Sequence, residues 1–510
     1  MGGDETRHLG GGLRGCRWGV YLAQFSWAFL GIGMLRFWYQ YNLYNLHATT
    51  DFGDQVALTN ILRALVIGIL LLCARRHELS PRTRSLLVWG SLVLMTLSSA
   101  LHALDLDGSN VGIEVARYVA CGVGLVWGGG MWMDFFARLS PARALFYLLA
   151  GVALSCLLSL ACGYLPPYAS ALVNLFVPAV AVLAYWRACH VLDEQGEPPL
   201  PNQVDLAYDE RYRAGVVRLV LSYCIFTFVL GIALGFPDGL PRELSQVERT
   251  LHQLALVALF AWVAWRVLVC GRRLWFPAVW CFENVLIIVA IVLLMSEKAA
   301  IFELATAIML TAESVFYPLA FYSAYDLGRH MRRTSMFMLG VVYGGSLLCM
   351  GAGRIVSFFV ANLPGGAAAM TVAMSVLVVV EMVLALRLAP TDRGLPLFSE
   401  VAVDVRRMAS QAGVLGCAAT PTAIPATGVS HALEADPPVA TSPLGALNDV
   451  ERNIVELVVR GRSRSAIARE LGYAENTVRN YLRNAYRKLG IHSKQELFDL
   501  VEGLSQDASE

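Results

Sequence analysis

The sequence predicts an all-α protein in two parts, a membrane domain of about twelve transmembrane helices and a small soluble helical domain at the C-terminus. Of the 510 residues, 56% are hydrophobic and only 15% are charged, whereas about a quarter of the residues of a soluble protein are charged. Apolar stretches of about 20 residues, the length that crosses a bilayer, follow one another as far as residue 388. Beyond residue 446, apolar residues instead recur at the intervals of short amphipathic helices.

The membrane part divides into two halves of six spans each. A polar, proline-rich middle loop, 190–213, separates the halves 18–189 and 214–388, and a short cytoplasmic segment, 1–17, precedes them. The predicted spans are 18–39, 55–74, 85–104, 111–134, 144–164, 168–189, 214–236, 250–269, 276–296, 299–323, 336–361 and 367–388.

The loops on one side of the predicted bundle are rich in arginine. They contain Arg75, Arg76, Arg82, Arg84, Arg138, Arg143, Arg187, Arg211, Arg213, Arg272, Arg273, Arg329, Arg332 and Arg333. The basic residues that stand out in the opposite loops are Arg242, Arg249 and Lys298. Because basic loops stay in the cytoplasm, we expect a multi-pass protein of the inner (cytoplasmic) membrane with both termini in the cytoplasm.

Six plus six spans with both termini inside resembles the architecture of the major facilitator superfamily. The resemblance is one of fold. The Gly-Asp-Arg signature that these transporters carry between spans two and three is missing, because the chain reads ARRHELSPRTR there. The resemblance therefore predicts the arrangement of the helices and does not by itself predict transport.

Charged residues inside the predicted spans are candidates for ligand contacts, because each costs about 2.5–3.5 kcal/mol on insertion scales and usually faces a cavity or a partner. In the superfamily, spans one, four, seven and ten line a central cavity. The resemblance therefore implies ligand contacts from Arg36, Arg117 and Glu313. The aromatic walls would be Trp38, Tyr39, Tyr118, Trp127 and Tyr317. An alternative interpretation is structural, with Arg–Glu pairs that lock helices together or side chains that reach the interface.

Residues 389–445 are predicted to be a flexible linker. They are rich in alanine, threonine, proline, glycine and valine, and no apolar stripe runs through their second half. About forty flexible residues span about 35 Å by random-coil scaling, so the C-terminal domain would stay near the membrane.

Four helices are predicted in the C-terminal domain, 446–505, from apolar residues at helical spacing. Their inward residues are Val450, Ile454, Leu457 and Val458 in the first helix, Ile467, Ala468 and Leu471 in the second, Val478, Leu482, Ala485 and Leu489 in the third, and Leu497, Leu500 and Val501 in the fourth. Gly461 is expected to end the first helix, and Gly472 suits the left-handed position after the second.

The outward face of the third helix carries three arginines, Arg479, Arg483 and Arg487, at intervals of four residues, so that they share one side. Asn476, Asn480 and Asn484 lie beside them at the same spacing. Arginine and asparagine make bidentate contacts to guanine and adenine in the major groove, where a helix-turn-helix places its second helix. From Leu447 to Lys494 there are ten Lys/Arg against five Asp/Glu, which favours nucleic acid as the partner. The alternative is an ordinary solvated basic face.

This domain resembles the LuxR-type helix-turn-helix of bacterial transcription regulators. The matching residues are Glu451, Gly461, Ile467-Ala468, Leu471-Gly472, Glu475-Asn476-Thr477-Val478-Arg479, Arg487-Lys488-Leu489-Gly490, Ser493-Lys494 and Glu496-Leu497. The resemblance implies base contacts from Arg479, Asn480 and Arg483, and phosphate contacts from Thr477 and Lys488. It also implies dimerisation on DNA through the fourth helix.

The domain departs from the family pattern at three positions. Asn448-Asp449 replaces the usual Thr-Pro, although Asn448 can still cap the helix. Ser465 replaces a lysine that contacts phosphate, with Arg462 and Arg464 nearby, and we count Arg464 among the expected DNA contacts. Ala474 replaces the serine cap of the third helix, a change that costs about 1 kcal/mol.

These features predict a one-component, membrane-embedded transcription regulator. A small molecule would bind the membrane domain, and the C-terminal domain would bind double-stranded promoter DNA, as an activator by family resemblance, together with RNA polymerase. The alternative is a transporter with an attached DNA-binding domain. The 11 cysteines show no paired spacing, and neither metal-ligand spacing, a phosphate loop nor a nucleophile–base arrangement is visible. The sequence therefore predicts no cofactor, no metal and no enzyme activity.

Overall fold

The computed structural model describes residues 25–44, 55–74, 80–106, 109–195, 213–240, 244–296, 298–331, 333–388, 397–402, 404–405, 447, 449–459, 467–468, 471, 473, 475–491 and 496–497. The chain divides into two compact units, Met1–Met408 and Ala409–Glu510. All regular elements in the described parts are helical, as the sequence predicts.

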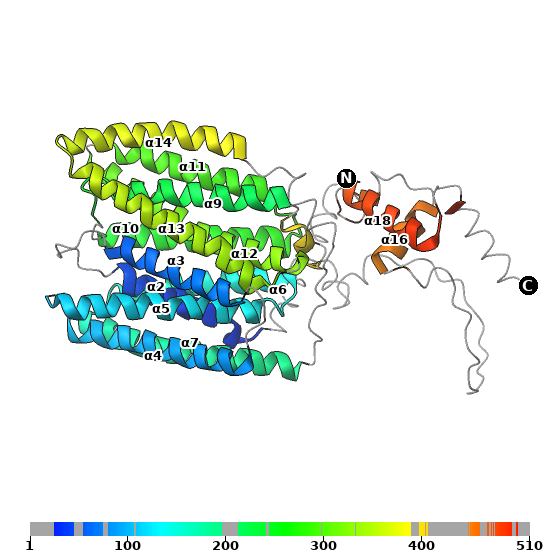
Figure 1. Cartoon of the computed structure of the whole chain (residues 1–510), viewed down its shortest axis with the longest axis horizontal. Helices are drawn as coiled ribbons and strands as arrows, with labels where there is room; N and C mark the ends of the chain where they lie inside the picture. The colour runs from blue at the N-terminus through cyan, green and yellow to red at the C-terminus, as the bar shows by residue number, and fades with distance from the viewer. Residues whose placement is uncertain are drawn as a thin grey trace, which may run out of the picture. The chain divides into compact units, whose positions relative to one another are not determined.

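In its described residues the first unit contains twelve long helices. They lie side by side, six before the middle loop in sequence and six after it (Figure 1). The first six are α2 (Gly31–Tyr44, preceded by a 3-10 turn at Trp27–Leu30), α3 (Gln55–Ala74), α4 (Pro81–Leu104), α5 (Val111–Phe136), α6 (Pro141–Cys162) and α7 (Pro167–Glu194). The second six are α9 (Arg213–Leu234), α10 (Gln246–Ala264, continued by a π-helical turn at Trp265–Val269), α11 (Phe276–Leu294), α12 (Ala299–His330), α13 (Ser335–Ala361) and α14 (Gly366–Leu388).

The packing of the second six helices repeats that of the first six. In the first half, α2 packs on α6, α3 on α5, and α4 on both α5 and α7. The corresponding helices of the second half make the same pairs, because α9 packs on α13, α10 on α12, and α11 on both α12 and α14. The halves meet through α3 against α13 and, equivalently, α6 against α10. This internal repeat is typical of membrane proteins built from two parallel halves. The division into six plus six membrane spans stays a prediction.

Nine of the described helices, α4 to α7 and α9 to α13, are long and apolar enough to cross a membrane, and α3 and α14 contain shorter apolar helices, Val56–Leu72 and Ala368–Val383. Large apolar side chains point outward from the bundle, among them Leu72, Leu86 and Phe359, each more than 60% exposed. Exposed apolar surface on this scale is typical of a surface in contact with lipid. The protein is therefore a multi-pass membrane protein.

Part of the predicted linker differs from the prediction. Residues 397–405 fold against the first unit, with Leu397, Phe398, Val401 and Val405 buried. The ring of Phe398 stacks on Tyr322 of α12, with centroids 4.5 Å apart. The segment folds there because its apolar residues recur at helical spacing and form one face, which packs on apolar side chains of the bundle.

Polar contacts fix the same segment, 397–405, to both halves. The Asp404 carboxylate accepts a 2.9 Å hydrogen bond from the backbone N–H of Ala142 in the first turn of α6, where the Ser140 side chain makes no capping bond. Glu400 lies 3.5 Å from Arg329 and 3.3 Å from His330 at the end of α12. Burial raises the pKa of the Glu400 carboxyl. The segment therefore clamps α6 of the first half to α12 of the second.

In the second unit the described residues form α16 (Asp449–Val459) and α18 (Glu475–Leu489), which pack on each other. Their common core contains Leu447, Ile454, Val455, Leu457, Val458, Ile467, Ala468, Val478, Leu482, Ala485, Ile491 and Leu497. The predicted inward residues of the first, second and third helices lie in or against this core, with Val450, Leu471 and Leu489 partly buried at its edge.

Candidate DNA-binding face and ligand cavity

The two sides of α18 differ sharply in composition. Val478 and Ala485 are fully buried against the core, and Leu482 is nearly so. Arg479, Arg483 and Arg487 are exposed, one turn apart from one another, because residues four apart share a helix face. The buried stripe therefore fixes the orientation of the helix so that a row of three guanidinium groups faces solvent.

The C-terminal end of α18 is closed by a glycine in the left-handed region. Gly490 has φ +69°, which glycine adopts without steric cost. The N–H of Ile491 donates to the carbonyl of Tyr486 at 2.9 Å, and that of Gly490 to Arg487 at 3.3 Å. This pair of bonds is a Schellman motif. It turns the chain so that Ile491 enters the core.

An ion pair holds α16 and α18 together. The ammonium of Lys488 lies 2.6 Å from the Glu451 carboxylate, which is only 3% exposed. Both residues belong to the motif read from the sequence, where Lys488 is an expected phosphate contact. In the structure its charge compensates the buried carboxylate, so the position of Lys488 next to the row of arginines is fixed by its partner on α16.

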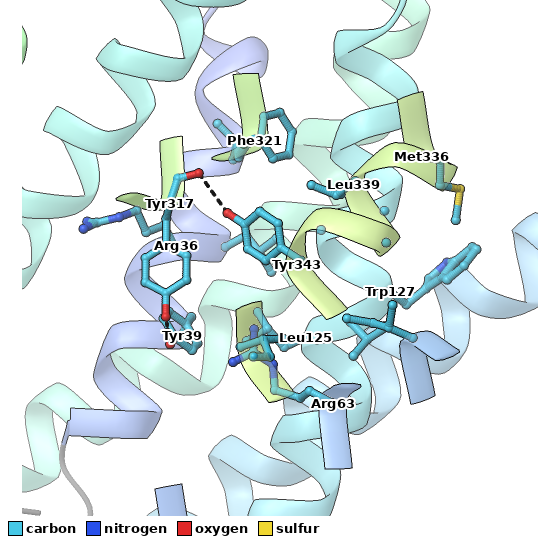
Figure 2. Close-up of a pocket in the computed structure, with 18 of the residues that line it drawn as sticks. Arg36, Tyr39, Arg63, Leu125, Trp127, Tyr317, Phe321, Met336, Leu339 and Tyr343 are labelled. Atoms are coloured by element: carbon cyan, nitrogen blue, oxygen red, sulfur yellow. Dashed lines mark hydrogen bonds between the residues drawn. The ribbon is translucent and has the colours of Figure 1, made fainter. Parts of the chain in front are cut away.

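A cavity of about 250 Å³ lies between the two halves of the membrane unit (Figure 2). The first half contributes Arg36 and Tyr39 from α2, Arg63 from α3 and Leu125 and Trp127 from α5, and the second half contributes Tyr317 and Phe321 from α12 and Met336, Leu339 and Tyr343 from α13. The cavity extends to Arg84, Asp134 and Thr334, at the ends of the helices next to the arginine-rich loops.

Three tyrosines form a connected wall of this cavity. The hydroxyls of Tyr39 and Tyr317 are 3.1 Å apart, and the Tyr343 hydroxyl donates to the backbone carbonyl of Tyr317 at 3.0 Å (Figure 2). The Tyr317 hydroxyl also lies 3.5 Å from the Glu313 carboxylate. Because these bonds join α2, α12 and α13, the wall depends on how the two halves are placed against each other.

Arg63 is the buried cation of the cavity. Arg63 is only 5% exposed. Its guanidinium carbon lies 5.1 Å from the centre of the Tyr39 ring. Its Nη1 donates a long bond of 3.4 Å to the Asn60 amide oxygen, and its Nε has no hydrogen-bond partner among the described groups. The donors of an arginine are rarely left unused in a buried position.

A second cavity of about 390 Å³ shares Gln40 with the first and is lined further by Tyr41, His102, Arg249 and His252. Arg36 lies at the partition between them, where its Nη1 donates to the Gln40 amide oxygen at 2.9 Å and to the Ser155 hydroxyl at 2.6 Å. A hydrogen-bonded cluster thus separates the two cavities.

Comparison with known proteins identifies the C-terminal unit. Residues 446–501 match the family model for bacterial regulatory proteins of the luxR family. These residues form a LuxR-type domain. Over 46 residues, 9% of the chain, the sequence is 41% identical to the spore germination protein GerE of Bacillus subtilis (strain 168), and the match spans about three fifths (62%) of that relative's length.

Two solved structures resemble the larger part of the chain. The human organic anion transporter MFSD10 (TETRAN) has a TM-score of 0.41 at 15% identity, covering 74% of this chain and 89% of its own. A bacterial homologue of the iron transporter ferroportin, in an outward-facing state, has a TM-score of 0.44 at 12% identity, covering 71% and 99%. No conclusion follows from similarity at this level, and the architecture of the membrane unit rests on its own helix packing.

Within the LuxR-type domain, the structure brings most of the expected DNA contacts onto one helix. Besides the three arginines, Asn480 and Thr477 are half-buried on α18, and Lys488 is at its end. Asn476 belongs to the first turn of α18. Arg464 lies outside the described residues. The roles of these residues in DNA binding stay predictions.

Three of the expected ligand contacts lie elsewhere than in the central cavity. Arg117 forms a 3.0 Å ion pair with Glu114 and a hydrogen bond to His102, and the Tyr118 ring lies 5.4 Å from its guanidinium. Trp38 donates to the Ser99 hydroxyl at 2.8 Å. The structural interpretation therefore fits Arg117 and Trp38 better, because both already bind partners inside the first half. The Tyr118 hydroxyl and the Arg117 Nε have no hydrogen-bond partner among the described groups. Arg36, Tyr39, Trp127 and Tyr317 do line the cavity, and Glu313 lies beside it.

One cluster combines metal-ligating types that the sequence does not show together. Donor atoms of Asp326, His330 and Glu400 lie within 4.8 Å of one another. His330 already lies 3.7 Å from Asp326, and the Arg329 guanidinium lies 3.5 Å from Glu400, so a metal cation would compete with a positive charge in place. These contacts are better described as ion pairs that hold 397–405.

The Glu451–Lys488 pair is expected to stabilise the LuxR-type domain. Replacing Lys488 with methionine removes a charged partner of the buried Glu451 carboxylate, which we expect to cost about 1–3 kcal/mol. Faster amide hydrogen exchange in α16 and α18 of the full-length protein would measure this. The matched control is Arg487→Met at the exposed neighbouring position, which should change exchange little. Equal effects of the two changes would contradict a specific role of the pair.

Proposed function

We propose that the protein is a one-component transcription regulator of the cytoplasmic membrane. Its membrane unit senses a small molecule, and its LuxR-type domain binds promoter DNA, as a dimer, and activates transcription with RNA polymerase. The observation that carries this proposal is the exposed arginine face of α18, in a chain whose other unit is a membrane bundle enclosing a cavity. We infer no catalytic step from either unit.

The orientation follows from the loops. Arginine-rich loops stay in the cytoplasm, which supports a cytoplasmic position for both termini, and hence for the DNA-binding domain. The central cavity extends to helix ends on this same side, which favours entry of the ligand from the cytoplasm. Since residues from both halves line the cavity, a ligand there can favour one arrangement of the halves over another.

Chromatin immunoprecipitation of the full-length protein, combined with transcript profiling, tests this function. We expect a small set of promoter-proximal sites whose genes respond to the level of the protein and to one class of compound. If the protein occupies no discrete sites, or if occupied genes do not respond, the regulator proposal fails. Arg479 and Arg483 variants separate specific from indirect effects.

A second candidate function is transport, with the DNA-binding domain reporting on the cargo. The internal repeat and the two cavities on either side of Gln40 favour it, because a cargo would pass between them when the Arg36 cluster opens. Net flux of a bound compound across proteoliposomes would establish transport. Binding without flux would favour a pure sensor.

A further inference from the structure

The central cavity has a charge that its own residues leave uncompensated. Arginine stays protonated in proteins, and the described hydrogen bonds of Arg63 and Arg36 go to neutral groups, namely Asn60, Gln40, Ser155 and Cys156. The carboxylate at the cavity edge is Glu313. At the mouth of the cavity, Arg84 and Asp134 form a 3.3 Å ion pair, so their charges cancel. Two guanidinium groups and one carboxylate leave a formal charge of +1 on the cavity.

A buried positive charge is costly unless an anion accompanies it. Arg63 has an Nε with no described partner and one long hydrogen bond, so donors remain for a carboxylate, which accepts two parallel bonds from one guanidinium. One such anion matches the formal charge of +1. A dianion would bring one negative charge too many into the bundle.

The other side chains that line the cavity indicate which kind of group the anion is attached to. Tyr39, Tyr317 and Tyr343 present ring surfaces next to Arg63, and Phe321 and Trp127 extend the aromatic lining (Figure 2). Aromatic rings pack favourably edge to face and offset. A volume of about 250 Å³ equals roughly eight water molecules at about 30 Å³ each, which is room for one or two aromatic rings.

We propose that the central cavity binds an aromatic monocarboxylate, with the carboxylate on Arg63 and the ring against the wall formed by Tyr39, Tyr317 and Tyr343. Arg36 supplies a second positive charge near the partition. This inference deepens the proposed function by naming the class of signal. Binding to the purified protein is measured without DNA, so that its failure would leave the DNA-binding proposal standing.

The test uses pairs of compounds that share shape and differ in charge, benzoate with benzamide and 1-naphthylacetate with 1-naphthylacetamide. Their affinities for the full-length protein in lipid nanodiscs are measured by calorimetry, with empty nanodiscs subtracted. We expect at least one acid to bind about tenfold or more tightly than its amide, because a charge-assisted hydrogen bond replaces a neutral one. Equal affinities within both pairs, or no binding of either acid, would overturn the proposal.

Variants then assign the charge to Arg63. Arg63→Gln should reduce the preference for the acid to about twofold or less, whereas Arg63→Lys should keep a part of it, because lysine retains the charge without the bidentate geometry. Arg187→Gln, at an exposed position of α7, is the matched control and should keep the full preference. A wild-type preference that survives in Arg63→Gln overturns the assignment. The wild-type comparison of acid with amide stands even if that variant fails to fold.

Discussion

Replacing Arg479 and Arg483 together with alanine is expected to lower the affinity of the full-length protein for its promoter sites by about a hundredfold or more. Each bidentate contact to a base is worth about 1–3 kcal/mol, and each 1.4 kcal/mol is about tenfold in affinity. Both side chains are exposed on the side of α18 opposite its buried stripe, so the domain should fold unchanged. Fluorescence anisotropy with promoter fragments recovered from the cell measures the loss.

The control removes one arginine from another helix. Arg452 is exposed on α16, and Arg452→Ala should weaken binding only slightly. The comparison also separates base from phosphate contacts, because losing a phosphate contact weakens binding to all sequences alike and reduces the salt dependence by about one ion. If the double variant binds promoter and unrelated DNA as the wild type does, α18 is not the reading helix.

The LuxR-type domain could be predicted from the sequence because its information is local. The spacing of Val478, Leu482 and Ala485 fixes which side of α18 is buried, and the arginines between them must then face outward. The Glu451–Lys488 contact was not predicted. It joins two residues that are 37 positions apart in sequence and lie on different helices. A pattern within one helix does not reveal which residue of another helix it meets.

The cavity shows the same limit in the membrane unit. Arg63 is a charged residue inside a predicted span, yet nothing in the sequence of α3 indicates that it faces Tyr39 and the second half. For Arg117 the sequence did carry a warning, because Glu114 stands three residues earlier, at the spacing of a helical ion pair. The docked segment also left a signal, since Leu397, Val401 and Val405 recur at helical spacing beside the proline-rich stretch that dominates the composition.

Replacing Phe398 with alanine is expected to release the segment 397–405 from the membrane unit. The Phe398 residue is 2% exposed, and its ring stacks on Tyr322 and lies 6.0 Å from the ring of Phe276. Its φ of +62° lies in the left-handed region, which costs a residue other than glycine about 1–2 kcal/mol. Burial of the ring offsets that cost, and truncating a buried phenylalanine costs about 3–5 kcal/mol.

Amide hydrogen exchange of the full-length protein in nanodiscs measures the release. Protection of 397–405 should fall by about a hundredfold or more in Phe398→Ala, because local opening becomes cheaper by the lost packing energy. Phe359→Ala, which truncates a phenylalanine 65% exposed on α13, should leave the segment protected. Equal exchange in the two variants would show that the ring does not hold the segment.

The two contacts of the segment 397–405 can be tested separately, because Asp404 binds the first half and Phe398 binds the second. Asp404→Ala removes the cap on Ala142 of α6, which we expect to loosen the first turn of α6 by about 1 kcal/mol and to leave the stacking on α12 in place. Phe398→Ala acts first on the α12 end. Because Asp404 binds α6 and Phe398 binds α12, a rearrangement that moves α6 away from α12 must break one of these two contacts.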